Sequence, residues 1–172
     1  MGQEYVMTYS GKKFFFDRPT TESICIEDIA HALSQLCRWT GHSKRFYSVA
    51  EHSFRVSVEC PKYPLRALLH DASEAYIADI SRPLKVLIGP LYRPIEERIE
   101  NAIYARFGLK EATVAEMEEV KRIDNVVLAT EARDLMGFSE EWMPKPLTKT
   151  IQPMGPLYAE QQFLERFRSL TR

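Results

Sequence analysis

The sequence predicts an all-α domain with a small β-hairpin at its N-terminal end. Two capping boxes, in which a Ser or Thr is followed three residues later by a Glu, mark the starts of helices. Residues 5–16 instead hold β-forming residues around a Ser10-Gly11 turn, which predicts the hairpin. Apolar residues recur at helical spacing elsewhere, for example at Ile26, Ile29, Ala30, Leu33 and Leu36.

Length and composition describe one ordinary globular domain over residues 1–172, with 45% hydrophobic and 27% charged residues. The formal charge of −1 gives no basic surface for a nucleic-acid polymer, so a local site must attract anionic substrates. No apolar run approaches about 18 residues and the start lacks a signal-peptide pattern, so we expect no membrane partner and a cytoplasmic location. Three cysteines without CxxC spacing favour reduced thiols over structural zinc.

A first helix is predicted over residues 27–39, and Gly41 should end it. The polar face of this helix would carry His31, Gln35 and Arg38, spaced at i, i+4 and i+7.

Two further helices and a loop are expected next. Residues 48–59 form the second helix, opened by the capping box of Ser48 and Glu51. A third helix should cover residues 64–79, because proline at its start suits a first turn. Residues 81–85 (Ser-Arg-Pro-Leu-Lys) are expected to form a basic loop.

The second half is expected to hold three helices. An amphipathic helix covers residues 92–107, and a long helix covers 113–136, opened by a capping box with Glu116. Asp124 falls on the apolar face of the long helix, where an aspartate is unexpected. That face is predicted from Met117, Val120, Val127 and Leu128. The last helix carries Phe163, Phe167 and Leu170.

An apolar segment of the third predicted helix carries a His-Asp pair and then a Glu. On a helix, His70 and Glu74 would share one face, with Asp71 at its edge. These polar groups are costly beside apolar residues unless a cation compensates them. Two other predicted helices present His52 and Asp124 toward the core. Two imidazoles and two carboxylates suit Zn²⁺, Mn²⁺, Fe²⁺ or Co²⁺, with coordination left open for water.

The order His…His-Asp…Asp resembles the HD-domain superfamily of metal-dependent phosphohydrolases, and the chain is similar to it over most of its length. That resemblance implies an HD-domain helical bundle. The flanking residues resemble the 5′-deoxynucleotidases and the small phage-type dATP triphosphohydrolases. The residues that carry this likeness are Arg38-Trp39, Ser48-Val49-Ala50-Glu51-His52-Ser53, His70-Asp71-Ala72-Ser73-Glu74, Asp79, Pro83 and Lys85.

The resemblance also implies roles for single residues. Glu74 would be a general acid/base or the ligand of an additional Mg²⁺ or Co²⁺, and Asp79 would contact the sugar or that ion. Arg38 and Lys85 would bind phosphate, with Arg38 joining Glu74 and Asp79 in catalysis. Trp39 either packs or contacts substrate. A divalent transition metal (Zn, Co or Mn) would be held by His52, His70, Asp71 and Asp124.

The histidine count excludes one type of HD site. All four histidines occur by position 70, whereas HD proteins with two bridged irons use further histidines between the His-Asp pair and the last Asp. We therefore do not expect a His-rich dinuclear centre.

Several residues admit two interpretations. His31 is either structural or at the surface, and His42 is either that or a phosphate contact. The phenylalanine run 14–16 is interpreted as part of the core in preference to a platform for a nucleobase. Glu131, on the predicted face of Asp124, either accepts a hydrogen bond from an imidazole or pairs with Arg133 or Lys121.

Together these features predict hydrolysis of a 2′-deoxynucleotide, of the dNTP (dATP) triphosphohydrolase type. Removal of phosphate from dNMPs, as in a 5′-deoxynucleotidase, remains the first alternative because both reactions need the same metal and phosphate contacts. A non-catalytic or alarmone-type HD nucleotide-binding protein is the second. The sequence shows no P-loop, which argues against ATP-driven transfer. We also expect a homo-oligomer.

Overall fold

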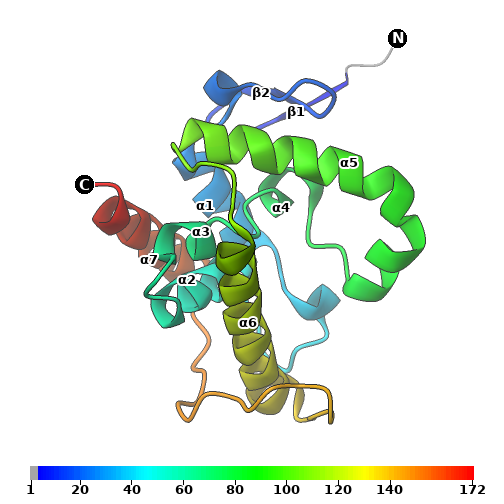
Figure 1. Cartoon of the computed structure of the whole chain (residues 1–172), viewed down its shortest axis with the longest axis vertical. Coiled ribbons are helices and arrows are strands. Elements are labelled where there is room, and N and C mark those ends of the chain that lie inside the picture. Colours follow the sequence, from blue (N-terminus) through cyan, green and yellow to red (C-terminus); the bar gives the residue numbers. More distant parts are fainter. Residues whose placement is uncertain (1–3) are drawn as a thin grey trace.

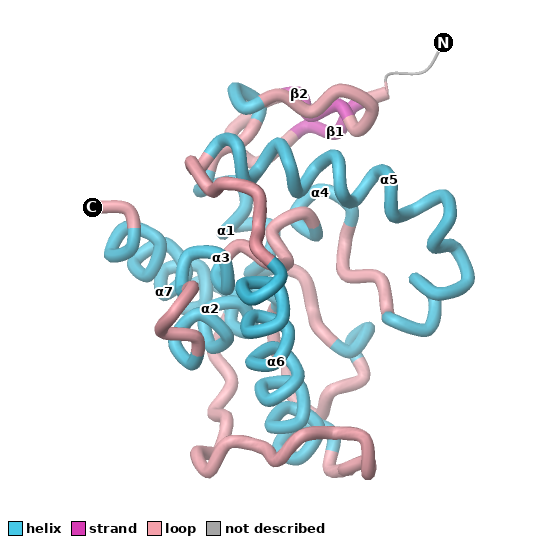
Figure 2. The backbone as a smooth tube through the Cα atoms, viewed as in Figure 1, coloured by secondary structure: helices cyan, strands magenta, loops and turns pink. Residues whose placement is uncertain are grey.

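The computed structural model describes residues 4–172 and is mostly helical, with a two-stranded hairpin near its N-terminal end (Figure 1). Figure 2 separates the helices, in cyan, from the magenta strands β1 (Tyr5–Met7) and β2 (Lys13–Phe15). This confirms the predicted class. The helices are α1 (Ile26–Gln35), α2 (Val49–Glu59), α3 (Pro64–Leu68), α4 (Glu74–Ile77), α5 (Arg82–Arg106), α6 (Val114–Glu131) and α7 (Pro156–Leu170).

The hairpin is joined to the helices through Asp28 of α1. The Oδ1 of Asp28 accepts from the backbone N–H of Ser10 at 2.6 Å, while Oδ2 accepts from the Ser10 hydroxyl at 2.8 Å. Gly11 completes the turn with a φ of 81°, a conformation that glycine adopts without steric cost. Phe14 is fully buried and stacks on Tyr76 at 3.8 Å between ring centroids. Phe14 is therefore core, as the sequence predicts.

The main core lies between α1, α2, α3 and α7, which pack against one another. α7 contributes Phe163, which is fully buried, and Phe167, which packs edge-on against Phe107. The other fully buried apolar residues of this core include Ile29, Leu33, Val49, Ala50, Leu68, Ile99 and Ile103.

The first helix ends earlier than its periodicity predicts. α1 stops at Gln35, and the chain then runs extended: Leu36 C=O accepts from the N–H of Val49 at 3.0 Å, and Arg38 N–H donates to Tyr47 C=O at 2.9 Å. This pairing with the segment before α2 outweighs continuation of the helix. Arg38 therefore leaves the predicted polar face with His31, and that prediction was wrong.

The predicted helix over residues 64–79 is also wrong, because it breaks in its middle. α3 ends at Leu68 and α4 begins at Glu74, with turns between them. The imidazole of His70 explains the break, since its Nδ1 donates to the C=O of Ala67 at 2.8 Å. A side chain that caps a carbonyl competes with the next helical hydrogen bond. His70 and Glu74 thus do not share a helix face.

α5 begins at Arg82, well before the predicted helix of residues 92–107, so residues 81–85 form its N-cap and first turn and not a loop. The sequence concealed this start because Pro90 and Pro94 interrupt the helical pattern.

These prolines also allow a bend in α5. A straight helix rises about 16 Å over eleven residues, yet Nζ of Lys85 lies 2.8 Å from Oε1 of Glu96. Each proline lacks the N–H that would bond four residues back, and such gaps are the usual cause of kinks. The ribbon accordingly curls at its N-terminal end (Figure 1).

α6 begins with the predicted capping box. The Thr113 hydroxyl accepts from Glu116 N–H at 3.2 Å, and Oε2 of Glu116 accepts from Thr113 N–H at 3.0 Å. A π-helical turn over residues 132–136 extends α6 to Gly137, whose φ is 79°. On the predicted core face, Met117 proves 52% exposed and is not core. The buried members of that face are Val120, Asp124 and Val127.

Cys25, Cys37 and Cys60 carry free thiols. Within residues 4–172, the structure contains no helix that combines the length and the apolar character needed to cross a bilayer.

Candidate metal centre and cavity

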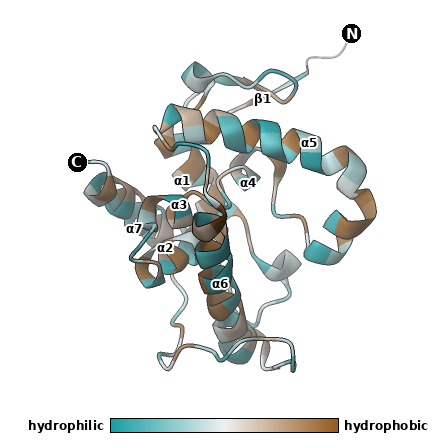
Figure 3. Cartoon of the chain, in the orientation of Figure 1, coloured by the Kyte–Doolittle hydropathy of each residue, from teal (hydrophilic) through white to brown (hydrophobic). Residues whose placement is uncertain are grey.

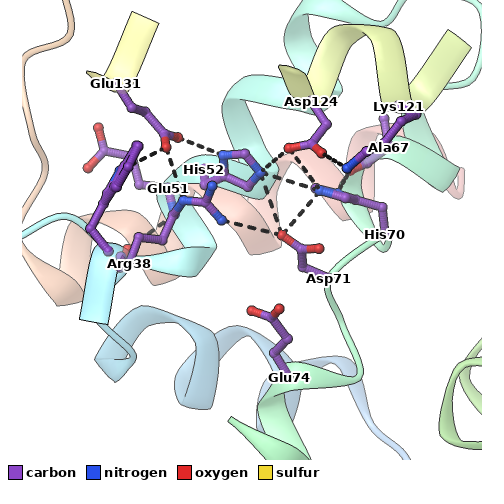
Figure 4. Close-up of polar contacts among 12 residues, drawn as sticks. Arg38, Glu51, His52, Ala67, His70, Asp71, Glu74, Lys121, Asp124 and Glu131 are labelled. Carbon is purple, nitrogen blue, oxygen red and sulfur yellow. Dashed lines mark hydrogen bonds and ion pairs between the residues drawn. The ribbon is translucent and has the colours of Figure 1, made fainter. Parts of the chain in front are cut away.

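Four side chains predicted to bind metal converge from three parts of the fold (Figure 4). His52 comes from the first turn of α2, Asp124 from α6, and His70 and Asp71 from the turn between α3 and α4. Nε2 of His52 lies 3.3 Å from Nε2 of His70 and 3.2 Å from Oδ1 of Asp124. Oδ2 of Asp71 lies 3.1 Å from Nε2 of His70 and 3.5 Å from Nε2 of His52.

Hydrogen bonds on the far side of each imidazole fix which nitrogen faces the cluster as an acceptor. A carbonyl oxygen only accepts, so His70 Nδ1 carries a proton for Ala67. His52 Nδ1 likewise lies 2.6 Å from Oε1 of Glu131. In the neutral rings both Nε2 atoms then present lone pairs to each other and to two carboxylates. Such a set of acceptors favours positive charge between them, from a proton or a metal ion.

The pKa shifts of the residues in the cluster also favour positive charge there. Burial and the Arg38 guanidinium disfavour protonation of His52, but Glu131 and Asp124 outweigh them and raise its pKa to about 9. Burial favours neutral Asp71 and Asp124, yet the two histidines hold the pKa of each carboxyl well below its usual range. The cluster therefore attracts positive charge, and a divalent ion supplies that charge as a proton would. The group His52, His70 and Asp71 could hold a metal ion.

Glu131 connects the centre to the segment after α1. The side chain is fully buried, and its Oε2 accepts from Arg38 Nε at 3.1 Å and from Trp39 Nε1 at 3.2 Å. Burial opposes ionisation, but Arg38 and His52 keep the pKa of Glu131 below its ordinary value. The prediction that Glu131 accepts from an imidazole is confirmed.

The alternative partners predicted for Glu131 bind elsewhere. Arg133 pairs with Asp134 at 2.7 Å, and Lys121 pairs with Asp124 at 2.7 Å. The salt-bridge interpretation of Glu131 was wrong for this reason.

Arg38 lies between the metal cluster and Glu131. Its Nη1 is 3.6 Å from Oδ2 of Asp71, and only 12% of its side chain is exposed. Burial disfavours the charged guanidinium, but Glu131 and Asp71 raise its pKa well above the usual value. Arg38 is therefore a fixed positive charge beside the cluster.

Glu74, from the first turn of α4, faces the same space (Figure 4). Its side chain is 6% exposed, and within residues 4–172 its Oε2 has no hydrogen-bond partner. Lys85 Nζ lies 3.5 Å from the other oxygen. Burial, together with Asp71 and Asp79, raises the pKa of Glu74 well above its ordinary value. A buried carboxyl with a raised pKa, which favours its protonated form, therefore borders the centre.

These groups open onto one cavity of about 580 Å³. Asp79 and Lys85 line it as predicted, and Trp39 forms part of its wall while packing edge-on against Phe138 at 5.8 Å. The remaining lining includes residues that the sequence did not single out as site residues: Thr40, Ile80, Lys121, Leu128, Phe138, Glu140, Trp142 and Met143.

Two predicted candidates lie outside this cavity. His42 is exposed and does not line it, so the structure gives no support to a phosphate contact there. His31 stacks on Tyr9 at 3.7 Å and lies 3.1 Å from Oε2 of Glu160. His31 therefore has the structural role that one interpretation gave it.

The sequence of the chain is similar to those of known proteins. No family model matches it. The chain is 39% identical to the protein named "Uncharacterized protein YfdR" of Escherichia coli (strain K12), over 97% of this chain and 96% of that protein. The chain belongs to the YfdR family. It is also 37% identical to an uncharacterized protein of Rhodobacter capsulatus, over 76% of this chain and 72% of that one.

The YfdR likeness covers nearly the full length of both chains, so it is a likeness of the whole domain that encloses the cavity. In this member of the YfdR family, the cavity joins a cation-attracting cluster to a fixed guanidinium, a lysine and a buried carboxyl with a raised pKa. That combination suits an anionic substrate whose reaction needs both charge stabilisation and proton transfer.

Phe138 and Trp142 of the cavity wall were not predicted from the sequence as site residues. Phe138 and Trp142 follow α6 in a segment without secondary-structure periodicity, and they are 38% and 62% exposed. Only the fold places them beside Asp124 and Arg38. Exposed aromatic residues in an irregular segment just after the last polar site residue are the one signal that was available.

Proposed function

We propose that this protein is a metal-dependent phosphohydrolase of 2′-deoxynucleotides, of the dNTP (dATP) triphosphohydrolase type. The observation that carries the proposal is the cluster of four convergent acceptors beside Arg38 in a cavity that also holds Lys85. The resemblance of the flanking residues to deoxynucleotide-hydrolysing HD enzymes supplies the substrate class.

A divalent transition metal (Zn²⁺, Co²⁺ or Mn²⁺) would be held by His52, His70, Asp71 and Asp124, and it would supply Lewis acidity and activate water for attack near neutral pH. Arg38 and Lys85 bind the phosphate and balance the charge that spreads over its oxygens in the transition state. Glu74, whose pKa is raised by burial and by Asp71 and Asp79, serves as the general acid and donates its proton to the leaving oxygen.

Asp79 completes the substrate site by accepting a hydrogen bond from the sugar. Its carboxylate lines the cavity on the segment between α4 and α5, beside Ile80. In the alternative role of Glu74, its carboxylate and that of Asp79 would instead hold a second, weaker ion such as Mg²⁺ or Co²⁺.

The size of the cavity fits a nucleotide. Small-molecule sites are commonly about 300–1,000 Å³, and this cavity measures about 580 Å³. Phe138 and Trp142 on its wall give a base flat apolar surfaces to stack on. A buried carboxyl whose Oε2 has no hydrogen-bond partner among residues 4–172 is costly to keep at Glu74, which favours catalysis over a sensor that only binds nucleotides.

One observation favours the alternative of a 5′-deoxynucleotidase acting on dNMPs. Both phosphate-binding cations are already partly neutralised, Arg38 by Glu131 and Lys85 by Glu96 at 2.8 Å. A monophosphate needs less positive charge than a triphosphate. The phosphate chain length must therefore be measured.

The test is to incubate metal-loaded protein with a panel of dNMPs, dNTPs and NTPs and to identify the inorganic product. We expect deoxynucleoside and intact triphosphate from dATP. Orthophosphate from dAMP, with dATP untouched, would select the nucleotidase. Binding without turnover across the panel, in protein shown to contain the metal, would make the protein a nucleotide-binding or alarmone-type HD protein instead.

A further inference from the structure

The first part of α5, residues 82–95, exposes an unusual amount of apolar side chain, and we call it the α5 hook. Leu87 is 79% exposed, Leu91 80%, Val86 71% and Leu84 45%. Within residues 82–95, only Gly89 and Tyr92 are buried. Figure 3 shows the brown bands of these residues along the curled end of α5. The body of the chain therefore leaves this helical segment uncovered.

A helix of this kind does not hold its shape without packing. Isolated helices shorter than about 12–15 residues are marginal in water, and Pro90 and Pro94 each remove a further hydrogen bond. Apolar residues around most of a helix are typical of a buried one. The composition of the α5 hook therefore indicates that another surface covers it.

The inner side of the hook already has a partner, which is the cavity. Lys85 points inward to Glu96 and Glu74, and the first turn from Ser81 to Lys85 forms one wall. The uncovered leucines are thus on the same short segment as part of the proposed phosphate site.

An apolar groove lies next to the exposed leucines. It has a volume of about 530 Å³ and is bounded on one side by Tyr92 and Ile95 of α5. Its other side is formed mainly by Phe16, Ile77 and Ile80. Each chain therefore carries both protruding leucines and a groove of matching chemistry within one patch, which is what an interface between two identical surfaces needs.

We propose that two copies of this chain pair through their α5 hooks about a twofold axis, with leucines of each hook seated in the groove of the other. Exposed fractions this large leave an apolar patch on the order of 500 Å² per chain, at the upper end for a monomer. Two such patches with their polar rims approach the roughly 1,200 Å² at which stable interfaces begin. A lipid surface fits less well, because it would cover the charged cavity wall beside the patch.

Pairing has a consequence for the site, and this consequence rests on the proposed function. Covering the outer face of the hook fixes its first turn and thereby Lys85. Turnover per chain should then rise with protein concentration and level off when the dimer is complete.

The test is sedimentation velocity with light scattering on wild-type protein, Leu87→Glu, Leu91→Glu and a matched control, Leu157→Glu. Leu157 lies on α7 and is 81% exposed, so it has the same side chain and exposure outside the patch. We expect a dimer for the wild type and the control, and a dissociation constant raised by about 100-fold or more in each hook variant. Hydrogen exchange of residues 82–91 should be slower in the dimer than in Leu91→Glu.

Circular dichroism and thermal melting show whether each variant is folded. Hydrogen exchange of the wild type at low and high protein concentration measures the protection of the α5 hook even if a variant does not fold. A wild type that stays monomeric across micromolar concentrations would overturn the proposal, as would an oligomer that both hook variants preserve. Binding of monomer to anionic vesicles, lost in Leu91→Glu, would overturn it in favour of a membrane. Sedimentation needs no substrate, so an intact dimer without turnover counts against the proposed function only.

Discussion

Nδ1 of His52 lies 2.6 Å from Oε1 of Glu131, across 79 residues of sequence, and both side chains are fully buried. This contact fixes the imidazole so that its Nε2 faces Asp71 and Asp124. The other oxygen of Glu131 accepts from Arg38 and Trp39, so one carboxylate orients both a ligand of the candidate metal and a candidate phosphate-binding cation.

Replacing the Glu131 carboxylate should weaken metal binding, although this side chain is not itself one of the proposed metal ligands. In Glu131→Gln a single amide oxygen must serve three donors, and the amide N–H₂ faces at least one of them. We expect metal affinity to fall by about 10- to 100-fold and the free energy of unfolding by about 3 kcal/mol, because Arg38 loses its buried partner. Metal titration and urea unfolding measure the two effects. Glu118→Gln, exposed on the same helix, should change neither.

The metal itself gives the second prediction. Wild-type protein purified without chelator should contain one transition-metal ion per chain, and Asp71→Ala should lack it. Because a ligand that binds only the folded state stabilises it, chelator should lower the melting temperature of the wild type and leave Asp71→Ala unchanged. Asp17→Ala, at an exposed surface pair, is the control. Full metal content in Asp71→Ala would show that this carboxylate is not a ligand.

The third prediction concerns proton transfer. Glu74→Gln should keep the metal and lose about 10²- to 10⁴-fold in kcat, the usual range for a general acid. The wild-type rate should fall as pH rises through the raised pKa of Glu74, since the acid form is then lost, and the variant should lack that limb. Glu140→Gln, exposed on the wall of the same cavity, should keep the wild-type profile. A near-normal rate in Glu74→Gln would make Glu74 structural.

How far the sequence alone reaches is clear from these residues. That His52 and Asp124 face inward could be predicted because both lie on helices whose starts carry capping signals, which place each side chain on a definite face. Glu131 followed from its helical spacing to Asp124. Each of these inferences uses only contacts within one helix.

Two of the failures depend on a contact distant in sequence or on a side chain that competes with the backbone. Arg38 left α1 because its backbone pairs with Tyr47, and the helix broke before Glu74 because His70 caps Ala67. Periodicity contains neither effect. The early start of α5 was hidden by Pro90 and Pro94, which normally mark the end of a helix.

Glu100 gives a prediction for stability in metal-free protein. Burial, with Glu96 and Asp71 nearby, raises its pKa from 4.5 to about 7. The folded state therefore holds a proton that the unfolded state has released, so stability is full below about pH 4.5 and is lost as pH rises through about 7. We expect a loss of about 1–2 kcal/mol, after allowance for partial solvent screening.

Glu100→Gln should remove this dependence. Urea unfolding of chelated protein at about pH 5 and about pH 8 should show the variant equal to the wild type at the lower pH and more stable at the higher one. Glu97→Gln, exposed on the same helix, should follow the wild type at both. The prediction would be contradicted if the free energy of unfolding of the wild type rose relative to that of Glu100→Gln between about pH 5 and about pH 8.

The last prediction is a preference for deoxyribose over ribose, and it depends on Asp79 and Ile80. Asp79 follows Ala78, whose φ of 65° is rare outside glycine and turns the chain sharply into the cavity wall. The carboxylate can accept from a 3′-hydroxyl, while the neighbouring Ile80 offers a 2′-hydroxyl no partner. An unpaired buried hydroxyl costs about 1–3 kcal/mol, which corresponds to roughly 5- to 150-fold in kcat/KM for dATP over ATP.

The decisive comparison is kcat/KM for dATP, ATP and dAMP at equal metal loading, in the wild type and in Asp79→Ala. We expect Asp79→Ala to lose activity on dATP, ATP and dAMP alike, because all three carry the 3′-hydroxyl, and to keep the ratio of dATP to ATP, which depends on the unpaired 2′-hydroxyl beside Ile80. Glu140→Gln should preserve the wild-type activity on all three, since this carboxylate lies on the wall at an exposed position. Equal efficiency of the wild type on ATP would defeat the sugar preference, and a preference for dAMP over dATP would select the 5′-deoxynucleotidase.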